Sequence, residues 1–323
     1  MIRKVSKVGQ SSLVVSLPSK WVKLYGIKKG DEVDIKSQGR SLQIITEKIS
    51  KGDKTQIDIT NMGSSLVWKH VVGAYKRGFK EIKIKFSGES IKVTDKFYKR
   101  KHLEVISPYE LINQISNSLI GIEVVDQGSN FCTIKQLATI NDDEFNTTFR
   151  RVFLLIKSML SDIISNMKNS ENINLDSIFF TDESINKFSI FCIRILSHRG
   201  YIDSLKVELF YDLINSLESI GDEIKILATK ISKKDTTLIL PILESLLESY
   251  DLFYTCFYNY EKHKVETILN STRDIKRSCD KLLTKHNSES INSITNHIKN
   301  ITKIIRDQTQ SIIELNFSIN SIL

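Results

Sequence analysis

The sequence predicts a multidomain, mainly helical chain that starts with a small strand-rich segment and continues through a small α/β region. Three observations predict this fold class. The 323 residues include 41% apolar side chains, which is enough for two or three domains with cores of their own. Only three prolines interrupt the chain. After residue 140, apolar side chains recur at three- and four-residue steps, which is the period of an amphipathic helix.

Positive charge is concentrated at the start of the chain. Residues 1–51 hold eleven Lys or Arg and four Asp or Glu, a net charge of +7. Residues 52–140 carry +4 and residues 141–323 carry −3, which leaves the formal +8 of the whole chain. A compact basic segment on a nearly neutral remainder is typical of a polyanion-binding head on a sensing or assembly body. The alternative is a generally basic surface.

Cysteine spacing and hydropathy indicate the compartment. The four cysteines are far apart and form no CxxC pair, which excludes zinc-finger spacing and indicates buried thiols in a reducing environment. No long apolar stretch precedes the first charges, and no uncharged apolar run approaches the roughly 18–20 residues that span a bilayer. We therefore expect a soluble, cytoplasmic protein.

The first two regions are predicted from strand and turn patterns. In residues 1–51, the β-branched run Leu13–Leu17 stops at Pro18, and alternating apolar residues flank Gln38-Gly39-Arg40 as in a hairpin. Residues 52–140 show the order βαβαββ, with helices over Ser64–Arg77 and Pro108–Leu119. This order predicts a small open sheet that is covered by two helices.

The third region, residues 141–323, is predicted to be entirely helical. Asn141–Glu144 place capping residues and negative charge at a helix start. The periodic stretches predict six helices, at 142–168, 182–199, 202–232, 236–260, 262–286 and 289–321. Helices of this length with short polar connections indicate two antiparallel three-helix bundles in tandem, at about 141–233 and 236–321.

The basic head has a recognisable arrangement. Its string MIRKVSKVGQSSLVVSLPSKWVKLYGIKKGDEVDI contains Arg3-Lys4-Val5, the turn Lys7-Val8-Gly9, the Leu13–Pro18 strand and the turn Gly30–Val33. Over residues 1–47 it resembles the AbrB/MazE/SpoVT family of DNA-binding domains. The resemblance implies an intertwined homodimer in which two hairpin-rich chains share one swapped-hairpin β-barrel. About fifty residues with few large apolar side chains make a marginal core alone, which agrees with pairing of two copies.

The resemblance also implies DNA contacts from basic residues near the first strand and the following helical turn. In this chain these residues are Arg3, Lys4, Lys7, Lys20 and Lys23. Contacts to phosphates give salt-dependent affinity without reading the base sequence. Gln10 stands where Asn or Arg often follows the turn glycine, which leaves base contacts there open. Some relatives are antitoxins or use the fold only to dimerise, and the plain alternative for the lysines is solvation.

One helix of the third region carries two acids beside its core stripe. Apolar side chains from Ile202 to Ile231 follow three- and four-residue steps, and Glu218 and Asp222 lie one turn apart on one face. Two carboxylates at this spacing repel each other, and a bound hard cation would reverse that cost. Such pairs are also common on solvated helix faces.

The string NSLESIGDEIKILA, Asn215–Ala228, resembles the LExIxD signature of PhoU proteins. The resemblance covers about 141–321 and implies two tandem three-helix bundles with iron or zinc clusters at an acidic ExxxD motif in each repeat. The implied metal ligands here are Glu218 and Asp222. PhoU proteins regulate phosphate uptake, usually beside a phosphate transporter and its sensor kinase. An AbrB-like head on a PhoU-like body resembles archaeal-type phosphate uptake regulators.

The second repeat departs from this pattern. Its equivalent stretch is ITKIIRD, with Thr302 and Arg306 where the two acids are expected. Arg306 would repel a cation, so we expect no second metal site there. Asp142, Asp143 or Glu144 could add ligands to the first site, but these acids serve equally well as helix caps.

The sequence favours a regulator over an enzyme. None of the six histidines pairs with another His or a Cys at ligand spacing, and P-loop, GxGxxG and GxSxG motifs are absent. We expect a homodimeric DNA-binding regulator of phosphate uptake and homeostasis, whose helical body senses or relays phosphate status. The alternative is an adaptor that inhibits a phosphate transporter or sensor kinase by protein contact, with a head that only dimerises. An enzyme with a metal at Glu218 and Asp222 is a more distant alternative.

Overall fold

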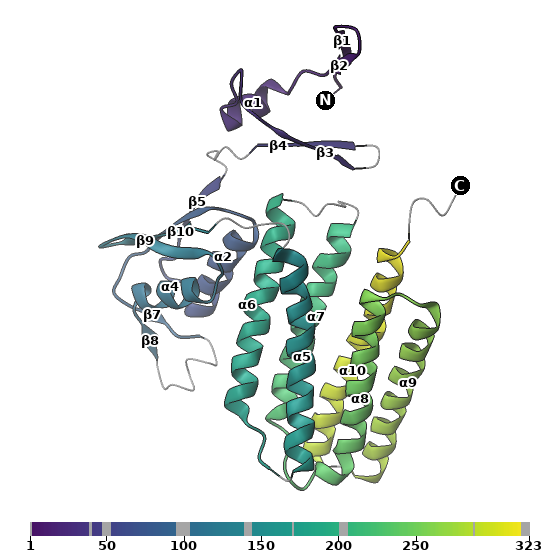
Figure 1. Cartoon of the computed structure of the whole chain (residues 1–323). Coiled ribbons are helices and arrows are strands. Elements are labelled where there is room, and N and C mark those ends of the chain that lie inside the picture. Colours follow the sequence, from purple (N-terminus) through teal and green to yellow (C-terminus); the bar gives the residue numbers. More distant parts are fainter. Residues whose placement is uncertain are drawn as a thin grey trace. The chain divides into compact units, whose positions relative to one another are not determined.

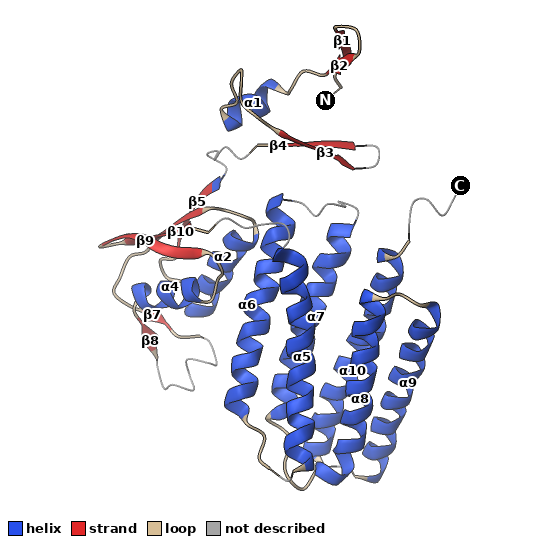
Figure 2. Ribbon diagram, viewed as in Figure 1, coloured by secondary structure: helices blue, strands red, loops and turns tan. Residues whose placement is uncertain are grey.

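The computed structural model describes residues 2–38, 41–46, 53–94, 104–138, 144–169, 171–199, 206–286 and 288–317. Within these residues the chain is mainly helical, with its strands in the N-terminal part (Figure 2). The predicted fold class is confirmed at this level. The turn residues Gly39 and Arg40, the predicted boundaries after residues 51 and 140, and the caps Asn141, Asp142 and Asp143 lie outside the described residues.

The head consists of two antiparallel hairpins with one short helix between them (Figure 1). The elements are β1 (Ser6–Val8), β2 (Ser12–Val14), α1 (Ser19–Tyr25), β3 (Asp34–Gln38) and β4 (Ser41–Ile45). The hairpins form two separate two-stranded sheets, β1-β2 and β3-β4. The two hairpins of a single copy are not joined in one sheet, and the swapped-hairpin barrel stays a prediction.

Two glycines with positive φ shape the head, one in the turn between β1 and β2 and one at the end of α1. Gly9, in the turn between β1 and β2, has φ of +72°, and Gly26, which ends α1, has φ of +60°. Side chains with a Cβ rarely adopt this left-handed region, so both turns depend on glycine. Gly26 N donates to Lys23 O, which satisfies a carbonyl at the end of the helix.

The α/β region contains a four-stranded sheet in the order β5-β6-β10-β9. Its elements are β5 (Lys54–Asp58), α2 (Ser64–Lys76), β6 (Glu81–Lys85), α4 (Pro108–Asn117), β9 (Ile122–Gly128) and β10 (Phe131–Gln136). β5 and β6 are parallel, while β10 pairs antiparallel with both β6 and β9. The element order is the predicted βαβαββ, with one addition. Two-residue strands β7 (Ile91–Lys92) and β8 (Val105–Ile106) form a ribbon before α4.

Six helices fill the described part of the third region, close to their predicted positions. They are α5 (Glu144–Lys168), α6 (Leu175–Arg199), α7 (Val207–Ala228), α8 (Thr236–Tyr258), α9 (Lys262–Lys285) and α10 (Glu289–Leu315). The predicted start of α6 at residue 182 is wrong by two turns. The side chain of Asn174 accepts a hydrogen bond from Ser177 N at 3.1 Å, which is the geometry of a helix N-cap.

These helices pack as two sets of three. α5, α6 and α7 contact one another, as do α8, α9 and α10, and the sets meet through α5 with α8 and α7 with α10 (Figure 1). By contacts the chain divides into two compact units, one of residues 1–116 and 122–137 and one of residues 117–121 and 138–323. The helical unit has its own core, because each helix buries a stripe of apolar side chains.

An aromatic cluster joins the two sets of helices between α5 and α8. Phe153 is fully buried, and its ring lies within 6.4 Å, between centroids, of six other rings. Tyr250 OH donates to Phe153 O at 3.0 Å, so the one polar atom of this buried tyrosine is satisfied. Burial raises the pKa of Tyr250 well above its ordinary value.

Candidate nucleic-acid interface

The five cations predicted to contact DNA are all exposed. Arg3 and Lys4 precede β1, Lys7 lies in β1 opposite Leu13, and Lys20 and Lys23 lie three residues apart on α1. In the part of the head that the structure describes, none of them lies within 4.0 Å of a carboxylate oxygen. Their charge is therefore available to a polyanion, which is what phosphate contacts need.

Where the structure describes side-chain burial in the head, none of the large apolar side chains is buried and nine of them are exposed. Leu13 is 71% exposed and Leu24 is 53% exposed, and α1 contains no buried residue. The other large apolar side chains that are exposed in the head are Ile2, Val5, Val8, Val14, Val15, Ile35 and Leu42. A single copy of the head therefore lacks a core of its own, because the side chains that would form one face solvent.

In the helical unit, Glu218 and Asp222 lie on α7 as predicted, but a lysine binds Asp222. Lys225 Nζ lies 2.5 Å from Asp222 Oδ1 and 2.7 Å from Asp182 Oδ2, which comes from α6. Asp182 is 5% exposed, and Asn186 Nδ2 also approaches its Oδ2 at 3.4 Å. An ammonium group thus bridges the two carboxylates at the contact between α6 and α7.

The burial of this ion pair changes the acidity of both partners. Burial raises the pKa of Asp182, and the hydrogen bond and charge of Lys225 only partly oppose that increase. Burial alone would lower the pKa of Lys225, but hydrogen bonds to Asp182 and Asp222 raise it above its ordinary value. Lys225 therefore stays charged, and Asp182 takes up a proton more readily than an exposed aspartate does.

A glycine lets the two helices come close at this point. A Cβ on Gly221 of α7 would lie 3.3 Å from Ile185 Cδ1 and 3.9 Å from Asp182 Oδ1, both on α6. This close approach places the Asp182 carboxylate within reach of Lys225, one turn further along α7. Sequence reasoning missed both Asp182 and Lys225. The i, i+3 spacing of Asp222 and Lys225 was visible in the sequence, whereas Asp182 enters only through helix packing.

The iron or zinc site at Glu218 and Asp222 remains a prediction. Among the residues that the structure describes, no group of three or more His, Cys, Asp or Glu side chains is placed to hold a metal ion. At the equivalent positions of α10, Thr302 is buried and donates to Ile298 O at 2.6 Å, while Arg306 is exposed. Thr302 and Arg306 thus differ in charge and in burial from Glu218 and Asp222, which are both half-buried.

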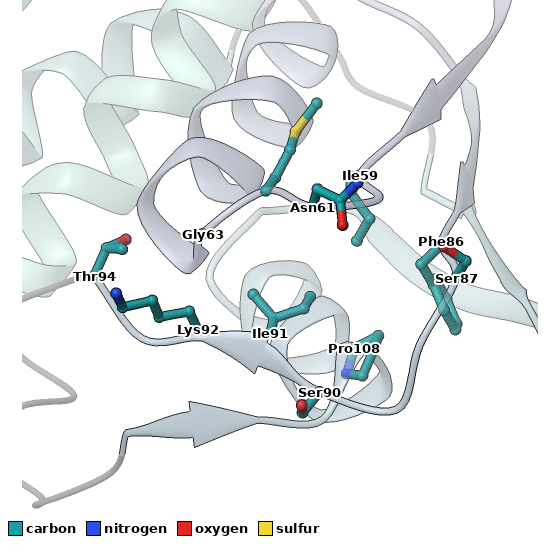
Figure 3. Close-up of a pocket in the computed structure, with 11 residues that line it drawn as sticks. Ile59, Asn61, Gly63, Phe86, Ser87, Ser90, Ile91, Lys92, Thr94 and Pro108 are labelled. Carbon is teal, nitrogen blue, oxygen red and sulfur yellow. The ribbon is translucent and has the colours of Figure 1, made fainter.

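The α/β region contains a cavity of about 240 Å³ beyond the ends of the parallel strands β5 and β6 (Figure 3). Its lining combines apolar Ile59, Phe86 and Ile91 with polar side chains such as Asn61 and Thr94. This edge of a parallel pair is where open α/β sheets bind ligands. The sequence of residues 52–140 contains no glycine-rich phosphate loop.

Thr94 closes the start of α2 next to this cavity. Its Oγ1 accepts from Ser65 N at 3.1 Å, and its own N donates to Ser64 Oγ at 3.0 Å. Figure 3 shows Thr94 beside Gly63, where a Cβ would lie 2.7 Å from Thr94 Cγ2. The close approach of Thr94 to the start of α2 therefore requires a glycine at position 63. Thr94 also accepts a hydrogen bond from Ser65 N, an amide at the start of α2 that could otherwise bind an anion.

None of the described helices is long and apolar enough to cross a membrane. A search of curated proteins and a search of solved structures found no match. Residues 6–54 match one family model, described as MazE_antitoxin, antidote-toxin recognition MazE, bacterial antitoxin. The AbrB/MazE part of the predicted resemblance is confirmed for this segment, and the PhoU-like part stays a prediction. Residues 6–54 of the head are thus similar to a MazE-type domain.

Proposed function

We propose that this chain is a homodimeric DNA-binding regulator of phosphate uptake and homeostasis. The head binds DNA as one half of a dimer, and the helical unit senses or relays phosphate status. One observation carries the DNA-binding part: the head, of which residues 6–54 match a MazE family model, exposes many of its apolar side chains and all five predicted DNA-contacting cations.

The exposed apolar side chains support a dimer through the head. Covering them removes apolar surface from water, at about 25 cal/mol for each Å². The covering partner is a second copy of the same segment, because domains of this type share one barrel between two chains. The dimer doubles the cations that face DNA and places them at two related positions, which suits a duplex with two half-sites.

The phosphate part rests on the sequence resemblance of Asn215–Ala228 to PhoU proteins. The packing of the six helices in two sets of three agrees with it. A bound iron or zinc ion at Glu218 and Asp222 is part of the same proposal, and it would have to displace Lys225 from Asp222. Metal analysis of the purified protein beside Glu218→Ala tests it, and equal metal content in the two proteins would refute the site.

DNA binding is tested by a mobility shift with a promoter fragment at low and moderate salt. We expect the wild-type protein to shift the fragment, and the variant Arg3→Ala/Lys4→Ala/Lys7→Ala to lose most of that binding. The slope of log affinity against log salt should fall by about 0.9 for each phosphate contact removed. Lys230→Ala/Lys233→Ala/Lys234→Ala is the matched control, since it removes the same charge from exposed positions between α7 and α8. Absence of a shift at low salt would refute the proposal.

The second candidate is an adaptor that acts on a phosphate transporter or sensor kinase by protein contact. The exposed apolar face of the head also suits this candidate, because a head that only dimerises would look the same. Chromatin immunoprecipitation from phosphate-starved and phosphate-replete cells separates the two. Enrichment near phosphate-transport genes supports the regulator, and no enrichment anywhere supports the adaptor.

A further inference from the structure

The outer face between α9 and α10 carries four cations, which we name the basic face: Arg273, Lys276, Lys303 and Arg306. All four side chains are exposed. Two contacts bracket them. Lys299 Nζ of α10 lies 2.5 Å from Asp280 Oδ1 of α9, and Arg306 Nη1 donates to Leu269 O at 3.4 Å.

These two contacts between α9 and α10 show which side chains of the two helices lie opposite each other. Residue numbers rise along α10 from 299 to 306 while they fall along α9 from 280 to 269, so the helices run antiparallel. Positions 273 and 276 share the face of α9 that holds 269 and 280, since the steps are three and four residues. By the same spacing, 303 lies on the face of α10 between 299 and 306. The four cations therefore gather within about two helical turns.

The charge of the basic face is not neutralised by neighbouring acids. Across the described part of the chain, none of the four cations lies within 4.0 Å of a carboxylate oxygen. Their hydrogen bonds go to neutral groups: Arg273 Nη1 donates to Asn270 Oδ1 and Arg306 to Leu269 O. Two acids of α9 are paired with other cations, since Asp280 pairs with Lys299 and Asp274 with Arg277. Asp307 is exposed and pairs with none of the four.

The basic face also lacks an apolar centre. Over the described residues of 262–315, no large apolar side chain is exposed. Protein interfaces are depleted in lysine at their centres and rely on apolar and aromatic side chains there. The sugar-phosphate backbone of DNA, in contrast, is contacted mainly by Lys, Arg and small polar side chains. Charge and composition together favour a phosphodiester backbone over a protein surface.

We propose that the basic face binds backbone phosphates of duplex DNA, as a second DNA contact besides the head. The proposal rests on the proposed function of the chain as a DNA-binding protein. The contact joins exposed cationic side chains to backbone phosphates. It is therefore independent of the base sequence of the DNA and sensitive to salt. It adds affinity for any duplex, while the head selects the site.

The test measures binding of the full-length protein to a labelled random-sequence DNA duplex by fluorescence anisotropy over a range of KCl concentrations. The variant Lys276→Ala/Lys303→Ala/Arg306→Ala should lower the slope of log affinity against log salt by about 2 to 3. The control Lys230→Ala/Lys233→Ala/Lys234→Ala removes equal charge and should keep the wild-type slope. Lys276→Arg/Lys303→Arg/Arg306→Lys keeps every charge and should keep it too. Circular dichroism and thermal unfolding establish that each variant is folded.

The outcomes distinguish this proposal from the function on which it rests. A wild-type slope in the alanine variant, together with loss of binding in Arg3→Ala/Lys4→Ala/Lys7→Ala, would overturn the basic face and leave the head as the DNA contact. Wild-type DNA binding by Arg3→Ala/Lys4→Ala/Lys7→Ala, together with a reduced salt slope in the basic-face alanine variant, would overturn the proposed role of the head instead. A changed oligomeric state without a changed slope would assign the basic face to an acidic protein surface and overturn the proposal.

Discussion

The head and the helical unit of this chain use the same kinds of apolar side chain in opposite ways. In the helical unit, Phe153 and Leu160 are 0% exposed, so the core is completed within one copy. In the head, Leu13 is 71% exposed and Leu42 is 68% exposed. The difference teaches that one chain can combine a unit with a completed core and a segment that leaves large apolar side chains in solvent.

Length explains the difference. A segment of about fifty residues buries a small fraction of its surface and is marginally stable alone, and the proposed dimer would compensate by sharing a core. Six long helices bury far more apolar surface per residue. Unfolding of the helical unit should therefore be independent of protein concentration, whereas folding of the head should depend on it.

The largest expected effect is in the helical core. Phe153→Ala removes a fully buried ring from the aromatic cluster, and it should lower the free energy of unfolding by about 3–5 kcal/mol. The measurement is urea unfolding followed by circular dichroism. The neighbouring Leu154→Ala is the control, because Leu154 is 45% exposed and should change stability by about 0.5 kcal/mol or less. Equal effects of the two substitutions would contradict the packing described for α5.

A smaller effect is expected in the head, and it should be visible in assembly instead of monomer stability. Leu13→Asp places a charge where the second copy of the proposed dimer would cover Leu13. The dimer should weaken at least about tenfold, since a buried leucine contributes about 1.5–3 kcal/mol. Light scattering coupled to gel filtration would show the mass fall toward 37.0 kDa, that of one chain. Ser16→Asp adds the same charge at an exposed position and should leave the mass unchanged. A variant that keeps the mass of a dimer would mean that the dimer does not cover Leu13, and a wild type at 37.0 kDa would mean that the head does not dimerise.

The smallest effect concerns Asp182 in the contact between α6 and α7. Its pKa is raised in the folded state, so the folded protein binds a proton there more readily than the unfolded chain. As pH falls below neutral toward the ordinary carboxyl range, the wild type should gain stability relative to Asp182→Asn, which has no proton to take up.

The expected difference is on the order of one to three degrees in thermal midpoint between pH 7 and pH 5. Differential scanning calorimetry of both proteins at the two pH values measures it. A relative loss of stability for the wild type on acidification would show that Lys225 outweighs burial and holds the pKa of Asp182 low.

Local patterns predicted most of the architecture. The 3.6-residue period located all six long helices, because each buries one stripe such as Leu213, Leu217 and Ile224. The start of α6 was missed because residues 175–181 carry polar side chains among the apolar ones, and only the Asn174 cap marks the true start. The βαβαββ order was predictable in part from Gly78 and Gly121, which follow the two helices and have positive φ.

The candidate sites were less predictable, for a physical reason. The exposed cations of the head follow from the resemblance, and their residue types alone predict phosphate contacts. Asp182 and Lys225 meet only because α6 passes close to Gly221, which no local pattern reports. The same holds for the basic face, since Lys303 and Arg273 are thirty residues apart and become neighbours through the packing of α9 on α10.

The position of β10 in its sheet has a consequence for the order in which the chain is made. β10 is the last strand of the α/β region in sequence, yet it lies between β6 and β9. A nascent chain that ends before Phe131 therefore has β9 with no strand beside it and β6 with one open edge. β5 and β6 can pair early, but β9 can join the sheet only after residues 131–136 have left the ribosome, just ahead of the first long helix.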